Sequence, residues 1–123
     1  MSSDYAERAK RFGLSSKEEI LELVSASDAT FLDVRTKGEV DKEPFSKVTT
    51  EYTVVHLPCT MNDATELTEK AAELLPNKDG NIVTFCGIGG RASVAKEALK
   101  KLGYRKVYNG GGLKDLDYLS SKS

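Results

Sequence analysis

A cysteine followed directly by a glycine-rich loop is the segment of this sequence best suited to chemistry. Cys86 ends the apolar run Ile82-Val83-Thr84-Phe85 and precedes Gly87-Ile88-Gly89-Gly90-Arg91. Glycine reaches backbone angles that other residues avoid, so this loop can curl until its amide N–H groups converge on one point. We expect the Cys86 sulfur to lie there, where the amides, the start of the next helix and Arg91 favour its thiolate. Cys86 is therefore the predicted nucleophile.

Three other roles for Cys86 and its loop fit the sequence less well. A free cysteine at the end of an apolar strand is often buried and inert, but the glycine loop and the helix after it favour the nucleophile. Dinucleotide binding is not favoured, because the Gly-x-Gly-x-x-Gly pattern is absent. A cysteine–histidine dyad has no support, since His56, the only histidine, lies thirty residues away.

The elements that must position Cys86 alternate between helices and short apolar strands, a pattern typical of an α/β fold. Helices are predicted over about 16–25, 63–75, 91–102 and 113–119, and strands over 30–34, 52–57, 82–86 and 106–109. Ser15 or Ser16 followed by glutamate forms a capping box at the first helix. The strand 82–86 has the strongest strand character and should lie inside the sheet. The polar segment 36–53 is predicted to be a long loop.

Length and composition limit the classes of protein that this chain can represent. At 123 residues it has room for one domain, predicted over 1–123 with a core at about 15–119 and short frayed tails. Its net charge of -1 gives no basic surface for nucleic acid. Two cysteines and one histidine form no disulfide framework and no metal site, so no cofactor is expected.

The location of the protein is predicted from what the chain lacks. No apolar run reaches about 18 residues, and the first residues do not form a signal peptide, so no membrane association is expected. The default is the cytoplasm, with an organelle left open because a transit segment can be removed. Nothing in the sequence indicates an oligomer, so a monomer is the default.

Three separated motifs together resemble the single-domain rhodaneses, the thiosulfate and persulfide sulfurtransferases. Cys86-Gly87-Ile88-Gly89-Gly90-Arg91 resembles their Cys-x-x-Gly-x-Arg loop, Leu32-Asp33-Val34-Arg35 with Glu39 their Asp-Val-Arg-x-x-x-Glu element, and the segment 102–113 their C-terminal end. The resemblance covers about 31–113. It implies a single rhodanese-like α/β domain with a short, mainly parallel central sheet and helices on both faces.

The resemblance also implies a reaction. The Cys86 thiolate would attack the outer sulfur of a small anionic donor such as thiosulfate, and the resulting persulfide would pass sulfur to cyanide or a thiol, including a protein thiol. The loop amides of Gly87, Ile88, Gly89, Gly90 and Arg91 would stabilise the anionic sulfur, while the Arg91 guanidinium would orient the donor.

The N-terminal motif is predicted to support the loop rather than to react. By resemblance, Asp33 and Arg35 form a buried or half-buried ion pair beneath the loop. Glu39 either joins that network or is a solvated carboxylate. The family's Gly-His-Ile segment is missing here, and Val40 with the charged residues after it takes its place, which alters the expected substrate rim.

Two smaller questions concern single residues. Cys59 is either a plain thiol or a resolving thiol for Cys86, and 27 residues of separation do not decide between these roles. His56 is predicted to be a strand histidine with a satisfied hydrogen bond.

Two alternative functions stay open. A rhodanese-like module without activity could bind a partner through its loops, although such a module has no need for a nucleophile. A phosphatase or arsenate reductase is disfavoured, because four residues separate Cys86 from Arg91 where the related phosphatases have five.

Overall fold

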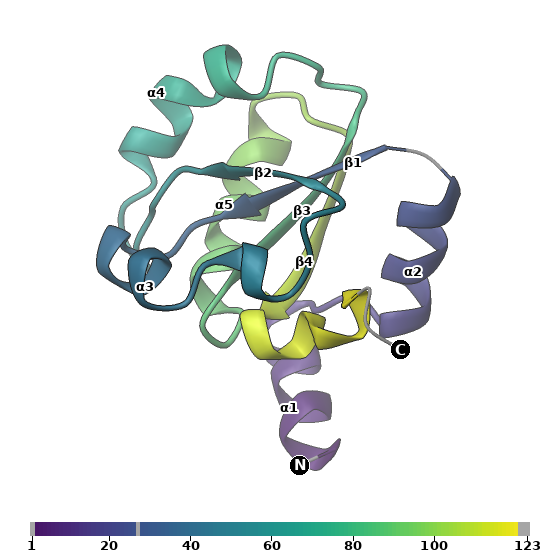
Figure 1. Ribbon diagram of the computed structural model, residues 1–123. Coiled ribbons are helices and arrows are strands. Elements are labelled where there is room, and N and C mark those ends of the chain that lie inside the picture. The colour runs from purple at the N-terminus through teal and green to yellow at the C-terminus, as the bar shows by residue number, and fades with distance from the viewer. Residues whose placement is uncertain (1, 27, 121–123) are drawn as a thin grey trace.

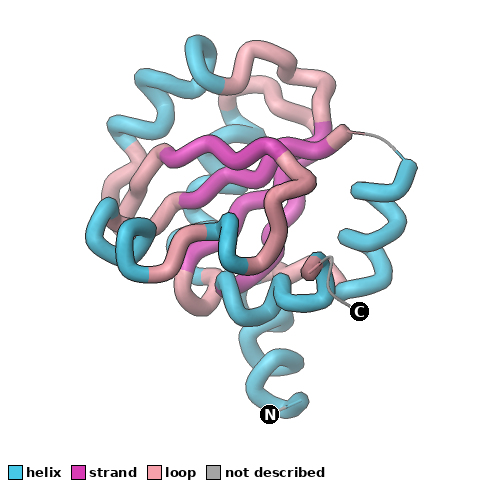
Figure 2. Tube along the Cα trace, viewed as in Figure 1, coloured by secondary structure: helices cyan, strands magenta, loops and turns pink. Residues whose placement is uncertain are grey.

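A four-stranded sheet forms the centre of the protein (Figures 1 and 2). A computed structural model describes residues 2–26 and 28–120. The strands are β1 (Ala29–Asp33), β2 (Thr53–His56), β3 (Asn81–Cys86) and β4 (Lys106–Gly112), in the order β2-β1-β3-β4. All three pairings are parallel, and β3 lies inside the sheet as predicted. Parallel strands bring their carboxyl ends to one edge, the edge at which α/β sheets bind ligands.

The register of the sheet brings residues of the three motifs to that edge through backbone pairing. Asp33 at the end of β1 lies opposite His56 and Phe85. Cys86 at the end of β3 lies opposite Gly112 of β4, after a shift in register between Thr84 and Cys86. The strand ends therefore converge beneath the glycine loop.

Three of the predicted helices are confirmed with small changes at their ends. They are α2 (Lys17–Ala26), α4 (Thr65–Leu74) and α5 (Gly90–Lys101). The backbone N–H of Glu19 donates to the Ser16 hydroxyl oxygen at 3.0 Å, which selects Ser16 over Ser15 as the capping residue. The predicted closing helix exists, but as the 3₁₀-helix η2 (Leu113–Leu119).

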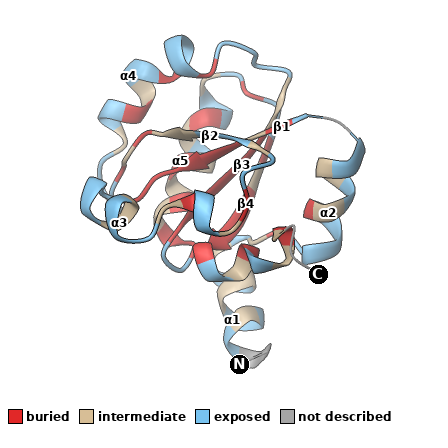
Figure 3. Cartoon of the chain, in the orientation of Figure 1, coloured by how far each residue is buried: buried red, intermediate tan, exposed pale blue. Residues whose placement is uncertain are grey.

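Successive side chains of each strand point to opposite faces of the sheet, and apolar residues build a core on each face. Figure 3 shows that most of β1 and β3 is buried. One face packs against α4 and α5, through Leu32, Ile82, Leu67, Ala71, Ala95 and Leu99. The other packs against α2 and η2, through Phe31, Val83, Phe85, Ile20 and Leu116. Helices on both faces, as predicted, keep the sheet rigid under the loop.

The segment 36–53 differs from the predicted loop. It contains α3 (Lys37–Lys42) and the 3₁₀-helix η1 (Phe45–Lys47). Thr36 and Glu39 form a reciprocal capping box at the start of α3. Phe45 is buried and its ring centroid lies 4.9 Å from that of Phe31. The prediction failed because one buried aromatic residue and one capping box, rather than an apolar periodicity, hold this segment.

The predicted frayed N-terminal tail is also wrong. Residues Ser2–Phe12 form the helix α1, which lies beside η2 in Figure 1. The Arg8 guanidinium contacts the Asp115 carboxylate at 2.8 and 3.0 Å, and the Asn109 side-chain amide donates to the Phe12 carbonyl. Polar contacts with the far end of the chain therefore hold α1 in place.

At the other end, Ser120 donates its backbone N–H to the Asp117 carbonyl. The remaining residues of the predicted frayed C-terminal tail, 121–123, lie outside the described residues. No helix within residues 2–26 and 28–120 is both long and apolar enough to cross a membrane.

Candidate active site

The loop after β3 turns sharply into α5 and brings the helix N-terminus onto Cys86. Gly89 has a φ of 111°, a left-handed conformation that glycine adopts at little cost, and it precedes the first residue of α5. A Cβ atom at this position would also lie 2.7 Å from the Leu14 side chain. The turn therefore requires glycine, as the sequence predicted for a tightly curled loop.

Two amides of this turn donate to the Cys86 sulfur. The Gly89 N–H lies 3.1 Å from Sγ and the Ala92 N–H lies 3.4 Å from it. The sequence predicted donors among residues 87–91, so Ala92 was missed. A helix leaves its first amides without partners, and extending the predicted set by one residue into α5 would have included Ala92.

Cys86 is almost fully buried, with 1% of its surface exposed, yet it lines a cavity of about 310 Å³. Gly87 and Ile88 of the loop, Leu113 of η2 and Glu39 of α3 also line this cavity. A cavity of this size suits a small reactant, and the sulfur at its side is almost fully covered by protein.

The Arg91 guanidinium is held by Glu39 and not left free over the cavity. Its two terminal nitrogens donate to the two Glu39 oxygens at 2.7 and 3.0 Å, the bidentate geometry of strong arginine–carboxylate pairs. This contact lowers the pKa of Glu39 to about 2, mainly through the hydrogen bond from Arg91. Glu39 therefore pairs with the loop arginine, whereas Arg35 pairs with Asp33, and the Glu39 side chain stays 40% exposed.

This pair predicts a pH dependence of stability. Because the pKa of Glu39 is lowered, its ionised form stabilises the fold above about pH 4.5, and that contribution disappears as the pH falls toward 2. We expect wild type to be more stable than Glu39→Gln at pH 6, and the difference to shrink between pH 4.5 and 2. Urea unfolding of both proteins across this range measures it. An advantage of wild type that is undiminished at pH 2 would contradict the prediction.

Asp33 and Arg35 form a buried ion pair at the end of β1. The Arg35 Nε and Nη2 donate to the two Asp33 oxygens at 2.9 and 2.8 Å, and the exposed fractions of the residues are 1% and 4%. The Arg35 carbonyl accepts a hydrogen bond from Nε2 of His56 at 2.7 Å. His56 is thus a strand histidine with a satisfied hydrogen bond, and it lies outside the cavity lining.

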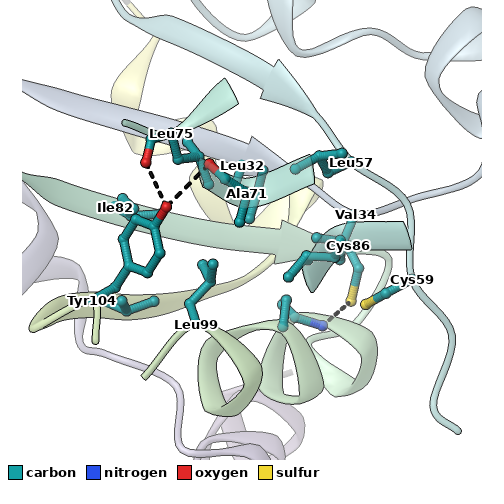
Figure 4. Close-up of a cluster of buried hydrophobic side chains, with 14 residues drawn as sticks. Leu32, Val34, Leu57, Cys59, Ala71, Leu75, Ile82, Cys86, Leu99 and Tyr104 are labelled. Carbon is teal, nitrogen blue, oxygen red and sulfur yellow. Dashed lines mark hydrogen bonds between the residues drawn. The ribbon is translucent and has the colours of Figure 1, made fainter. Parts of the chain in front are cut away.

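Cys59 lies behind the loop, in the same apolar cluster as Cys86. Figure 4 shows both sulfur atoms at one end of this cluster. The Cys59 thiol donates to the Arg91 carbonyl at 3.4 Å. Burial, with the nearby Cys86, raises the pKa of Cys59 to about 11, so it stays a neutral thiol near pH 7. Of the two cysteines, only Cys86 lines the cavity.

The cavity lining includes two lysines, Lys42 of α3 and Lys114 of η2, together with the carboxylate of Glu43. Within residues 2–26 and 28–120, neither lysine lies within ion-pair distance of a carboxylate, whereas Arg35 and Arg91 are each paired. Among the same described residues, no cluster of three or more His, Cys, Asp or Glu side chains is arranged to hold a metal ion. The site thus combines a buried sulfur, two amides that donate to it, and a cavity lined by two lysines and by the further carboxylate Glu43.

Comparison with known proteins gives consistent matches. Residues 16–115 match the model of the rhodanese-like domain family. Thiosulfate sulfurtransferase PspE from Escherichia coli (strain K12) is 34% identical over 71 residues, which make up 57% of this chain and 68% of that protein.

Solved structures match over a larger share of the chain. A rhodanese with anions from E. coli is 27% identical, with a TM-score of 0.51 over 71% of this chain and 89% of that one. The human single-domain sulfurtransferase TSTD1 is 22% identical, with a TM-score of 0.54 over 78% of this chain and 86% of that one, a likeness that shows the fold alone.

Proposed function

Since the chain belongs to the rhodanese-like domain family, we propose that it is a sulfurtransferase that carries sulfur on Cys86. One observation carries the proposal: two amides donate to the sulfur of a cysteine that lines a small cavity. Amides aimed at one atom stabilise negative charge there, both on a thiolate and on the inner sulfur of a persulfide.

The proposed reaction has two steps and needs no cofactor. In the first, the Cys86 thiolate attacks the outer sulfur of thiosulfate, an Sγ–S bond forms, and the S–S bond of thiosulfate breaks with its electron pair leaving on sulfite. In the second, cyanide or a thiolate attacks the outer sulfur of the persulfide, and the electron pair of the Sγ–S bond returns to Cys86. Thiocyanate or a new persulfide is released, and the thiolate is regenerated.

The residues around the sulfur take distinct roles in this scheme. The amides of Gly89 and Ala92 stabilise the sulfur of Cys86, while Gly87, Ile88 and Gly90 shape the loop around the entering sulfur. Arg91, neutralised by Glu39, keeps the loop in place and adds little net charge for a donor. Lys42 and Lys114 supply positive charge, one unit of which Glu43 offsets, and the remainder attracts an anionic donor to the cavity.

Mass spectrometry of the intact protein after incubation with thiosulfate tests the proposal. We expect one added sulfur atom, found by proteolysis on the peptide that contains Cys86, and its loss on addition of cyanide. Cys59→Ser is the matched control and should take up the same sulfur, because Cys59 does not line the cavity. A folded, reduced wild type that takes up no sulfur from thiosulfate or mercaptopyruvate would exclude the enzyme and favour a binding module.

A further inference from the structure

We propose that Arg8 of α1 is a positioning residue for the sulfur-bearing loop, acting on the same peptide group that donates to Cys86. Arg8 Nη1 donates to the Ile88 carbonyl oxygen at 2.8 Å. The Gly89 N–H donates to Cys86 Sγ at 3.1 Å. This inference rests on the proposed function, because it concerns the sulfur that would carry the transferred atom.

The argument follows from the planarity of the peptide bond. The carbonyl of Ile88 and the N–H of Gly89 belong to one rigid unit, and in a trans peptide they point in opposite directions. Holding the carbonyl oxygen on one side therefore aims the N–H at the sulfur on the other. A hydrogen bond from a guanidinium also polarises the peptide and makes its N–H a stronger donor. Arg8 thus acts through Gly89 and does not touch the sulfur itself.

Arg8 is held in position by a second charged residue. Its Nη1 and Nη2 contact the two Asp115 oxygens at 2.8 and 3.0 Å, and its side chain is only 15% exposed. Asp115 also accepts the backbone N–H of Gly112 at 2.7 Å, and Gly112 pairs with Cys86 across the sheet. A continuous set of contacts therefore links η2, α1 and the loop around Cys86.

The other contacts of α1 lead to the same loop. The Asn109 side-chain amide donates both to the Phe12 carbonyl at 3.1 Å and to the Gly89 carbonyl at 3.0 Å. The Phe12 ring packs against Gly90, since a Cβ atom added at Gly90 would lie 3.4 Å from the ring. The helix α1 lies before the residues that match the family model, 16–115, and it contacts the active-site turn.

Arg8 is poorly suited to bind the sulfur donor directly. Its guanidinium already donates to Asp4, Asp115 and the Ile88 carbonyl. It lines a cavity of about 470 Å³ between α1 and η2, and Cys86 does not line that cavity. If Arg8 positions the loop, its loss should change the rate of the chemical step. If Arg8 bound the donor, its loss would change the thiosulfate concentration that gives half of the maximal rate.

Single-turnover kinetics separates these two roles. The rate of persulfide formation is followed by rapid acid quench and mass spectrometry over a range of thiosulfate concentrations, well below the melting temperature of each variant. For Arg8→Ala we expect the saturating rate to fall about ten-fold, with the half-saturating concentration unchanged. Arg8→Lys should recover part of the rate, since an ammonium can reach the carbonyl but lacks the guanidinium fork.

Lys10→Ala is the matched control, because Lys10 is a basic residue on the same helix, is exposed, and does not line the cavity that Arg8 lines. It should keep the wild-type rate. A wild-type saturating rate in Arg8→Ala would overturn the inference. A raised half-saturating concentration with an unchanged rate would also overturn it and make Arg8 a donor-binding residue.

A second measurement separates this inference from the proposed function. Alkylation of Cys86 by iodoacetamide needs no sulfur donor, and in a Cys59→Ser background it reports on Cys86 alone. We expect Arg8→Ala to slow it several-fold and Lys10→Ala to leave it unchanged. If wild type takes up no sulfur, the proposed function fails, and the alkylation rates still decide whether Arg8 positions the loop.

Discussion

Replacing Cys86 by serine is expected to lower sulfur transfer from thiosulfate to cyanide by about a thousand-fold or more, the scale of loss when a nucleophile is removed. A serine hydroxyl is not ionised near neutral pH, so the amides of Gly89 and Ala92 would face a weak nucleophile. An oxygen in this position also cannot form the persulfide. Steady-state formation of thiocyanate, compared with wild type at equal concentration, measures the effect.

Two results make this loss interpretable. Circular dichroism and the melting temperature should show that Cys86→Ser is folded, because serine has nearly the shape of cysteine and its oxygen can accept the same amides. Cys59→Ser should keep most of the activity, since its hydroxyl can still donate to the Arg91 carbonyl. Transfer by Cys86→Ser at the wild-type rate would show that Cys86 does not carry the sulfur.

The strand–loop–helix unit around Cys86 was predictable because its determinants are local. The β-branched and aromatic run of β3, the glycines after it and the spaced apolar residues of α5 are each readable within a few positions. The same applies to α2, whose serine cap and apolar face lie within ten residues. The amide set differs from the predicted residues 87–91: Gly89 donates to the sulfur, and so does Ala92, which lies outside that range.

The contacts that hold the loop from outside were not predictable in this way. Arg8 and Asp115 are 107 residues apart, and Glu39 and Arg91 are 52 residues apart. Such pairs leave no periodic signal, since any surface carboxylate could partner any arginine. The helix α3 is different, because Thr36 and Glu39 already have the spacing of a capping box and could have revealed it.

These pairs change the electrostatics predicted for the site. The sequence favoured Arg91 as the group that orients an anionic donor, but Glu39 satisfies its guanidinium. Asp33 does the same for Arg35. Both arginines thus have a carboxylate partner, and within residues 2–26 and 28–120 the cavity-lining lysines Lys42 and Lys114 have no ion-pair partner.

Removing the carboxylate charge of Asp33 should produce the largest loss of stability among the substitutions considered for this site. Asp33→Asn leaves the buried Arg35 guanidinium without its counter-charge while keeping the shape of the side chain. Breaking a buried ion pair from one side costs about 3–5 kcal/mol of unfolding free energy. Urea unfolding at pH 7, with the slope compared with that of wild type, measures the change.

Two further variants determine whether the cost comes from the unpaired charge. Asp41→Asn removes an aspartate of an exposed pair with Lys37, whose side chains are 64% and 83% exposed, and should cost at most about 1 kcal/mol. The double variant Asp33→Leu with Arg35→Met removes both charges and should be more stable than Asp33→Asn, since a buried pair can often be replaced by apolar side chains. If the double variant is no more stable than Asp33→Asn, the unpaired buried charge of Arg35 does not explain the cost of Asp33→Asn.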